Sequence, residues 1–244
     1  MTSDQLKLLV ATVQQLSLAR DLETIMVAVR TAARNLTGAD GATFVLRDND
    51  MCYYAEEDAI SPLWKGQRFP MSACISGWTM MNKQPAIVPD VYFDVRIPAE
   101  IYRPTFVKSL AMVPIRTLNP IGAIGNYWAQ PHSPTVAELQ LLQSLADITS
   151  VSIANVYAYN DLKTQNNKLR EIAFLQSHQV RAPIANVQGL YQLFNFNNPS
   201  DPINTEILEK LKISSEALDA VIRRIVQSTT EIISEQDSND GIVN

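Results

Sequence analysis

The segment around His178 has residue types suited to phosphoryl chemistry: it reads Ser177-His178-Gln179-Val180-Arg181-Ala182-Pro183-Ile184. Neutral imidazole is well populated near pH 7 and can attack a phosphoryl group. An apolar repeat predicts that Val180 and Val187 face inward on a helix, so His178 should point to solvent. Pro183 removes a backbone donor, which bends or loosens the turn near the histidine. The alternative is an ordinary surface histidine on a structural helix that Pro183 merely bends.

Two helices should carry this segment. The first is expected to begin at an N-cap and proline pair, Ser133-Pro134. Its apolar residues keep a helical spacing through residues 139–172 and then repeat every seven residues, at Ala173, Val180, Val187 and Phe194. Residues 195–201 predict a loop, and Pro202 can open a second helix. That helix has an apolar repeat close to 3.5 residues, at Leu208, Leu211, Ser215, Leu218, Ile222, Ile225, Thr229 and Ile232.

A long amphipathic helix of this kind usually pairs with a second copy of itself. We therefore expect a parallel homodimer, in which two helical hairpins form a four-helix bundle. Residues 236–244 are polar and should form a disordered tail.

The N-terminal half has a different pattern. Apolar residues recur every three to four positions across residues 4–37, which predicts helix, and Gly38 should end it. Short runs rich in β-formers follow between turn residues, at 42–46, 51–54, 85–88, 110–115 and 120–127. Residues 47–50 should form the turn between the first two runs. Helices followed by adjacent strands predict an α+β domain, with an antiparallel sheet flanked by helices.

Composition limits the function classes. The chain has 244 residues and a formal net charge of −5, which argues against an electrostatic grip on nucleic acid or an anionic membrane. No stretch approaches the ~18 apolar residues of a membrane span, and the N-terminus has no signal-peptide pattern. Cys52 and Cys74 are too few for a disulfide scaffold and lack the spacing of a zinc site. We expect a protein of the reducing cytoplasm with no bound metal.

The string from residue 177 to 190 resembles the H-box of sensor histidine kinases, within a likeness that covers residues 165–235. The resemblance implies that His178 accepts phosphate from ATP and passes it to an aspartate on the receiver domain of a response regulator. Arg181 and Pro183 match the family pattern. Gln179 departs from it, because the family usually has an acid there that draws a proton from the imidazole, and an amide cannot act as that base.

ATP binding is not expected from this chain itself. Histidine kinases hold ATP in a separate domain with glycine-rich segments, whereas only Gly189 and Gly241 follow Gly125 here. Neither common glycine-rich phosphate-binding motif occurs. We expect no cofactor in the chain, and ATP and Mg²⁺ to act only through a catalytic domain supplied in cis or in trans. The alternative function is a non-catalytic dimeric signalling adaptor with a degenerate H-box.

Residues 1–160 resemble a GAF domain, an α+β ligand-binding module found in signalling kinases. The resemblance rests on the initial helices and on four segments in a characteristic order, 41–47, 69–78, 109–115 and 120–125. It implies a pocket between the sheet and the loops over it. The family binds many unrelated ligands, so the fold leaves the ligand unknown.

The implied pocket should involve residues 63–78 and 90–103. Trp64, Trp78, Tyr92 and Tyr102 could stack on a planar ligand, and Arg96 and Arg103 could hold an anion. The alternative is that the aromatic residues belong to the core and the arginines to the solvated surface.

Cys74 also lies in the implied pocket. Bilin-binding relatives attach their chromophore to a cysteine that is often followed by histidine, but Ile75 follows Cys74, so covalent attachment is not expected. Redox sensing would need a thiol pKa lowered by a helix N-terminus, and the alternative is an inert buried thiol. Methionine sulfoxide reductases of this fold use several cysteines, whereas this chain has only Cys52 and Cys74.

The sequence as a whole predicts a sensor joined to a phosphoacceptor hairpin. The expected boundaries are 1–160 for the GAF-like sensor, 161–172 for a helical signalling linker, 173–235 for the dimerisation and phosphoacceptor hairpin, and 236–244 for the tail. Ligand occupancy would alter the pairing of the long helix and so control whether His178 reaches a kinase active site.

Overall fold

The computed structural model describes residues 2–96 and 98–240. The chain divides into two compact units between Asp161 and Leu162, and one helix, α4 (Val136–Leu193), contributes to both. Among the described residues, no helix has a stretch that is both long and apolar enough to cross a membrane.

Helices α1 (Ser3–Leu18) and α2 (Leu22–Thr37) occupy the segment predicted as one helical run. The run is broken because Asp21 has an extended backbone. Its carboxylate accepts a hydrogen bond from the backbone N–H of Thr24 at 2.7 Å, which caps α2. Gly38 ends α2 in the left-handed conformation, at φ +64°, as predicted.

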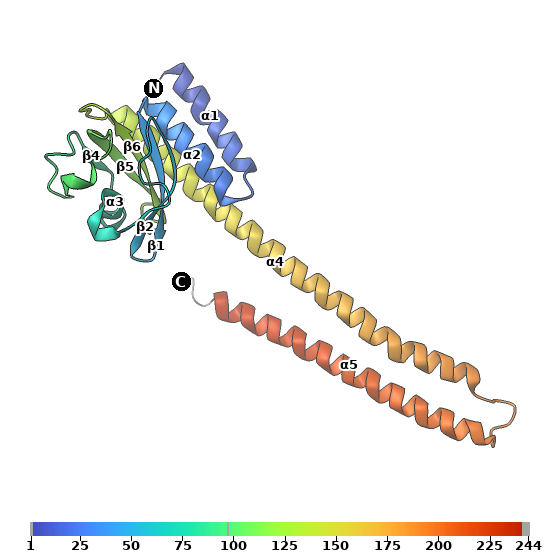
Figure 1. Cartoon of the computed structure of the whole chain (residues 1–244). Helices are drawn as coiled ribbons and strands as arrows, with labels where there is room; N and C mark the ends of the chain where they lie inside the picture. Colours follow the sequence, from blue (N-terminus) through green and yellow to red (C-terminus); the bar gives the residue numbers. More distant parts are fainter. Residues whose placement is uncertain (1, 97, 241–244) are drawn as a thin grey trace. The chain divides into compact units, whose positions relative to one another are not determined.

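Six antiparallel strands form one sheet in the order β3-β2-β1-β6-β5-β4 (Figure 1). They are β1 (Gly41–Asp48), β2 (Met51–Ala59), β3 (Arg68–Pro70), β4 (Ala86–Val88), β5 (Ser109–Ile115) and β6 (Gly122–Trp128). The α+β class and the antiparallel sheet are confirmed. The predicted turn between β1 and β2 forms, with Asn49 at φ +55°. Strand β3 is not apparent from the sequence pattern, and β2 runs on to Ala59 instead of ending at Tyr54.

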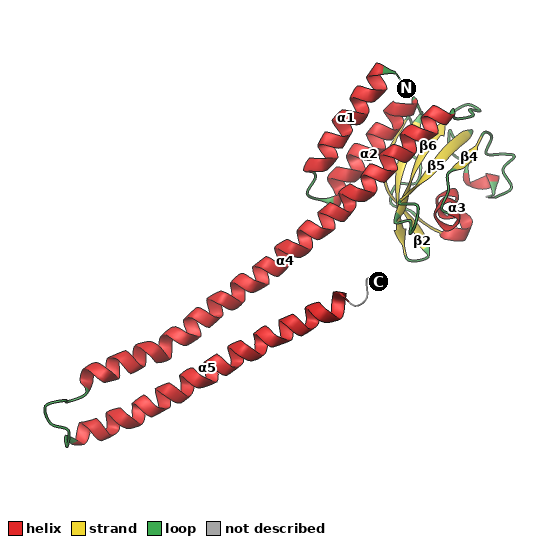
Figure 2. Ribbon diagram, turned by 180° about the vertical axis from the view of Figure 1, so that it is seen from behind, coloured by secondary structure: helices red, strands yellow, loops and turns green. Residues whose placement is uncertain are grey.

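The sheet separates two cores (Figures 1 and 2). Helices α1, α2 and α4 cover one face, where the fully buried side chains include Ile25, Val29, Phe44, Leu142 and Leu145. Helix α3 (Ile75–Asn82), the short 3₁₀ turns η1 (Met71–Ala73) and η2 (Ala99–Ile101) and the connecting loops cover the other. That second core contains Val45, Tyr54, Trp64, Met112 and Tyr127.

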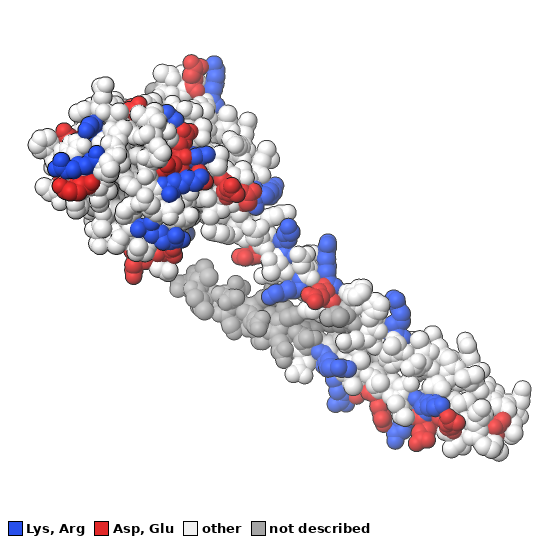
Figure 3. Space-filling view, in the orientation of Figure 1, with Lys and Arg blue, Asp and Glu red and all other residues white. Residues whose placement is uncertain are grey.

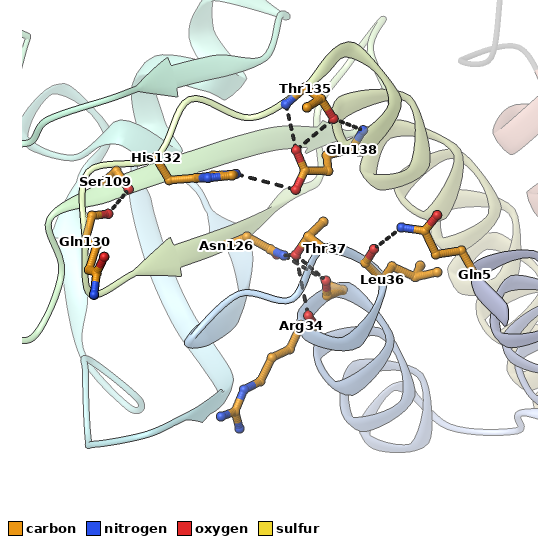
Figure 4. Close-up of polar contacts among 11 residues, drawn as sticks. Gln5, Arg34, Leu36, Thr37, Ser109, Asn126, Gln130, His132, Thr135 and Glu138 are labelled. Carbon is orange, nitrogen blue, oxygen red and sulfur yellow. Dashed lines mark hydrogen bonds and ion pairs between the residues drawn. The ribbon is translucent and has the colours of Figure 1, made fainter. Parts of the chain in front are cut away.

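Helix α4 begins with a reciprocal capping box. Glu138 Oε2 accepts from the backbone N–H and the hydroxyl of Thr135 at 2.6 and 2.8 Å, and Thr135 Oγ1 accepts from the Glu138 N–H at 3.2 Å. The prediction that Ser133-Pro134 caps this helix is therefore wrong, because the capping side chain lies two residues later. His132 Nε2 lies 3.4 Å from Glu138 Oε1 (Figure 4), and its ring packs on Trp128 at the end of β6.

The amides of the buried Asn126 and the half-buried Gln5 hold α1 and α2 over the same sheet. Asn126 Nδ2 on β6 donates to the Ala33 carbonyl at 2.7 Å and to Thr37 Oγ1 at 2.5 Å (Figure 4). Gln5 Nε2 donates to the Leu36 carbonyl at 2.9 Å. These bonds join α1, α2 and β6 on the face of the sheet that α4 also covers.

Helix α5 (Pro202–Asp240) returns beside the second half of α4, after the loop predicted at 195–201. Asn195 N–H donates to Asn204 Oδ1 at 2.8 Å, and Asn204 Nδ2 donates to the Asn195 carbonyl at 3.1 Å. The helix extends into the segment predicted as a disordered tail, of which residues 241–244 lie outside the described part of the chain.

In a single copy of the chain the buried side of α5 includes Ile207, Ser214 and Val221, together with the half-buried Leu211, Leu218 and Ile225 of the predicted repeat. The other members of the repeat, Leu208 and Ile222, are 56% and 48% exposed. The repeat therefore covers two neighbouring stripes of the helix, because one residue is about 100° of rotation. Leu208, Ser215 and Ile222 form an exposed outer stripe; Thr229 and Ile232 lie beyond the described side chains.

Candidate functional site

His178 is exposed on α4, with Val180 half-buried on the inner side. The imidazole ring packs against Phe174 one turn earlier, with 4.5 Å between ring centroids. The Ser177 hydroxyl donates to the Ala173 carbonyl at 2.8 Å and so points along the helix. The imidazole is therefore accessible from solvent.

The other predicted H-box residues divide between surface and interior. Gln179 and Arg181 are exposed, and Pro183 is buried inside α4. Because proline has no N–H, the Gln179 carbonyl lacks its usual helical donor four residues later. The helix is thus weakened in the turn that directly follows His178.

A small cavity lies between the sheet and α3. Its volume is about 10 Å³, room for about one water molecule. Aromatic rings meet edge to face around it: Trp64 lies 5.6 Å from Tyr54, 5.9 Å from Tyr102 and 5.6 Å from Tyr127 between centroids. Burial raises the pKa of all three tyrosines, so their phenols stay neutral. Of the predicted pocket residues, Trp64, Cys74 and Tyr102 line this cavity.

Trp78 and Arg96 lie together, as the prediction of a shared site requires. The Arg96 guanidinium stacks on Trp78 at 4.7 Å from the ring centroid and forms an ion pair with Asp94 at 2.5 Å. Burial would raise the pKa of Asp94, but the hydrogen bonds and charge of Arg96 outweigh it and lower that pKa. An anionic ligand at Arg96 would have to compete with this carboxylate.

Tyr92 and Arg103 do not line the cavity. The Lys108 ammonium donates to Tyr92 Oη at 3.1 Å and lies 4.7 Å from the ring centroid. Arg103 pairs with Glu100 at 3.4 Å, and its side chain is 66% exposed. The structure therefore separates the predicted ligand residues into three cavity residues, a Trp78–Arg96 pair and two surface residues.

Cys74 is the N-cap of α3. Its Sγ accepts from the Gly77 N–H at 3.4 Å and lies 3.1 Å from Ser76 Oγ. Ser76 Oγ lies 3.1 Å from Tyr54 Oη on the other side. Position 77 requires glycine, because the Cβ of any other residue would overlap the Met71 backbone. The start of α3 thus gathers several polar hydrogens around one sulfur.

The two thiols of the second core differ in protonation. A hydrogen bond from Cys52 lowers the pKa of Cys74 to about 6 against the opposing effect of burial, with further bonds from Ser76, Gly77 and Tyr54. The same bond to Cys74, together with burial, raises the pKa of Cys52. The two pKa values therefore shift in opposite directions, and Cys74 is the more acidic of the two thiols.

Acidic and basic side chains alternate on the face drawn in Figure 3. Ion pairs of the first unit include Arg34 with Asp58 at 2.5 Å and Arg68 with Asp48 at 2.9 Å. That face is therefore of mixed sign.

Comparison with protein families identifies the first unit. The profile of the GAF domain matches residues 19–154, more than half of the 244-residue chain. The chain belongs to the GAF domain family. No curated protein matched the chain.

Solved structures share the fold of this GAF domain. The GAF domain of an Acinetobacter phosphoenolpyruvate-protein phosphotransferase is 18% identical, with a TM-score of 0.56 over 66% of this chain and 99% of that one. A free methionine-R-sulfoxide reductase from Neisseria meningitidis is 15% identical, with a TM-score of 0.56 over 65% and 95%. The bacteriophytochrome RpBphP3 of R. palustris is 15% identical, with a TM-score of 0.61 over 74% and 43%. At these identities the likeness shows the fold alone.

The predicted ranges 63–78 and 90–103 include six of the nine residues that line the cavity of the GAF domain, and the residues that escaped the sequence analysis are Tyr54, Met112 and Tyr127. Cys52 and Tyr54 stand two residues apart on β2, so the alternation of a strand could have placed both on one face. Met112 and Tyr127 come from β5 and β6, in which every residue is buried, so alternation does not distinguish their faces.

Proposed function

We propose that this chain is the sensory and phosphoacceptor portion of a two-component histidine kinase. In this function the GAF domain senses a small ligand, and His178 receives a phosphoryl group and passes it to a response regulator. The continuity of α4 supports this proposal most. Leu142 and Leu145 of α4 are fully buried in the GAF core, and the same helix carries the exposed His178.

His178 acts as the nucleophile in this proposal. A ring nitrogen attacks the γ-phosphoryl group of ATP, ADP leaves, and the phosphoimidazole then transfers the group to an aspartate of the receiver domain. Arg181 lies three residues later, on the same side of the helix, and can contact the phosphoryl oxygens. ATP and Mg²⁺ act in a catalytic domain supplied in cis or in trans, in the cytoplasm.

The signal travels as a change in helix geometry. Ligand occupancy shifts α4 at the GAF core, which rotates or bends the helix around Pro183 and alters access to His178. The buried Pro183, which has no N–H to donate to the Gln179 carbonyl, supports a locally weakened helix at this position. The outer stripe of α5 supports a homodimer, because its leucine and isoleucine are about half exposed in one protomer.

The sensory input is proposed to act through the residues around the cavity. Because the cavity holds about one water, a larger ligand requires Tyr102 and the loop that carries it to move away from Trp64. The Trp78–Arg96 pair lies on the neighbouring loop and helix and would then contact the ligand, with Tyr92 and Arg103 at its outer edge.

Phosphorylation in trans tests the role of His178. The chain is incubated with ATP, Mg²⁺ and isolated histidine kinase catalytic domains, and phosphohistidine is measured as acid-labile, base-stable label. We expect label on wild type and none on His178→Gln. His132→Gln is the matched control, since the chain has only two histidines. Label that persists in His178→Gln, or no label with any catalytic domain, would contradict the proposal.

Crosslinking tests the coupling. Single cysteines placed along residues 155–172, in a Cys52→Ser, Cys74→Ser background, report the register between two copies of α4. We expect the crosslinking pattern measured with an empty GAF cavity to differ from the pattern measured with a ligand bound. A dimer whose register never changes would rule out coupling through α4.

Gln179 favours a second candidate, a non-catalytic dimeric adaptor that presents the hairpin to kinases or response regulators. An amide cannot accept the imidazole proton during phosphoryl transfer. Under this function His178→Gln leaves signalling unchanged, whereas phosphotransfer requires the histidine. The same variant therefore separates the two.

A further inference from the structure

An open hollow of about 580 Å³ lies on the face of the sheet that α4 covers. Its walls come from three places in the GAF domain: the turn between β1 and β2, the turn between β5 and β6, and residues 153–157 of α4. Small-molecule sites usually enclose ~300–1,000 Å³, so the hollow has the size of such a site. It is separate from the closed cavity on the other face of the sheet.

The inner wall of the hollow is apolar. Ile153 is 2% exposed and belongs to the core that α4 covers, and the half-buried Leu46 and Ile121 pack against the same core. Tyr157 lies one turn after Ile153 on α4, is 54% exposed, and adds an aromatic ring to the wall. A flat apolar molecule can therefore lie against aliphatic and aromatic side chains here.

Two exposed arginines, one from each turn, also line the hollow. Arg47 Nε donates to the Asn49 carbonyl at 3.2 Å, and Arg116 Nε donates to the Asn119 carbonyl at 2.7 Å. Each guanidinium is thus tied to its own turn by one nitrogen. Its other N–H groups remain available to an anion, which an arginine can bind through two parallel hydrogen bonds.

These two arginines differ from the rest of the GAF domain. Residues 1–161 contain six other arginines, of which five pair with a carboxylate and one stacks on a tyrosine. Among the described residues, neither Arg47 nor Arg116 forms an ion pair, and no Asp or Glu lines the hollow. Asp48, next to Arg47, pairs with Arg68 instead. The hollow therefore carries positive charge that nothing described there neutralises.

Arg116 also has an unusual backbone conformation. Its φ is +66°, in the left-handed region that favours glycine and that long side chains rarely adopt. Strained residues of this kind occur most often at binding and active sites, where the surrounding structure holds them. The β5–β6 turn thus places an arginine beside the hollow at a position where glycine would be less strained.

We propose that this hollow is a binding site for a small organic anion with a flat apolar body. Arg116 and Arg47 hold the anionic group, and Tyr157 and the apolar wall contact the body. The inference goes beyond the proposed function and needs neither His178 nor the closed cavity. Because α4 forms one wall, an occupant would join that helix to both turns, a few residues before the division of the two units at Asp161.

Titration calorimetry of the full chain with three probes tests the site. The probes are 2-naphthoate, its neutral analogue 2-naphthamide, and inorganic phosphate. We expect one saturable site for naphthoate. The other two probes should bind at least roughly tenfold more weakly, because naphthamide lacks the charge and phosphate lacks the apolar body. None of these readouts involves phosphorylation of the chain.

Substitutions locate the bound probe. Arg116→Gln and Arg47→Gln should each weaken naphthoate binding roughly tenfold, because each removes a charged hydrogen-bond donor. Tyr157→Ala should also weaken it, through lost contact with the rings. Lys7→Gln is the control, since it removes one positive charge from α1, outside the hollow, and should leave the affinity unchanged. Circular dichroism checks that each variant is folded.

Three results would overturn the proposal. The first is the absence of saturable naphthoate binding to the wild type. The second is an affinity for naphthamide or for phosphate equal to that for naphthoate. The third is an unchanged naphthoate affinity in Arg116→Gln and Arg47→Gln, which would place the probe elsewhere on the chain.

Discussion

At the scale of single residues, hydrogen bonding determines where charge resides in this GAF domain. Cys52 and Cys74 share one apolar core, yet their pKa values shift in opposite directions because one thiol donates and the other accepts. Trp64 and the three tyrosines close the space beside them. Hydrogen bonding thus makes one cysteine more acidic than the other, although both are buried in the same core.

The lowered pKa of Cys74 predicts a pH-dependent stability. The folded state favours the Cys74 thiolate, whose pKa is about 6 there against the ordinary 9.0, so this contribution is complete above pH 9 and is lost as pH falls through 6. We expect the free energy of unfolding, measured with urea, to rise with pH across this window in the wild type.

The matched variant for this measurement is Cys74→Ser, which keeps a capping side chain without an ionisable thiol. Its free energy of unfolding should rise less steeply than that of the wild type over the same pH range. Parallel curves for the two proteins would show that Cys74 does not titrate below its ordinary pKa. Both histidines are retained in the variant, so their titration cancels in the comparison.

At the scale of elements, close backbone contact decides where α3 begins. The N–H of Gly77 reaches the Cys74 sulfur only because no side chain separates α3 from the preceding 3₁₀ turn at Met71. Gly189 is the opposite case: it lies near the C-terminal end of α4, and nothing lies within 4 Å of the position of a Cβ.

Substitution of these two glycines by alanine is expected to change the free energy of unfolding in opposite directions. Gly77→Ala should destabilise the GAF domain by ~1–3 kcal/mol, because the backbone around Met71 must move to admit the methyl group. Gly189→Ala should stabilise the hairpin by roughly 0.5–1 kcal/mol, because alanine loses less backbone entropy in a helix. Urea unfolding of each variant measures both; a neutral Gly77→Ala would contradict the contact described.

Much of the element order follows from the sequence, and the exceptions have physical causes. The strands from Ala42 and Leu110, the Gly38 stop and the 195–201 loop carry strong local signals. The interruption between α1 and α2 before Asp21 has no such local signal, because the apolar spacing continues through it. The apolar repeat of α5 does not separate the side that packs on α4 from the exposed side, because two neighbouring stripes share Leu211, Leu218 and Ile225, which are half-buried. The cavity depends on contacts between distant strands and could not be read from spacing.

At the scale of the whole molecule, the chain joins two units through one helix. The GAF unit has a core on each face of its sheet, whereas the described side chains of the hairpin bury little beyond the seam between α4 and α5. Exposed apolar residues on the hairpin include Leu162, Leu169, Tyr191, Leu208 and Ile222. An area of this kind is expected to be covered by a second hairpin.

Lysine substitution in the outer stripe tests this assembly. The double variant Leu208→Lys, Ile222→Lys should be monomeric at concentrations where the wild type is a dimer, because burying two ammonium groups is costly. Light scattering after size exclusion measures the mass. Glu209→Lys, next to the stripe on the same helix, is the control and should remain dimeric. A monomeric wild type, or a double variant that stays dimeric, would rule out this interface.

The sharing of α4 between the two units restricts how such proteins can be recombined. Adding one residue within 162–172 rotates everything beyond it by about 100°, whereas adding seven changes the phase by only ~20°. Chimeras in which another sensor replaces the GAF domain should therefore fall into length classes that recur every seven residues. A sensor of unrelated fold would satisfy this rule if it ended in a helix whose length falls in the same class. The length of the linker, more than its sequence, would then determine whether a chimera transmits its signal.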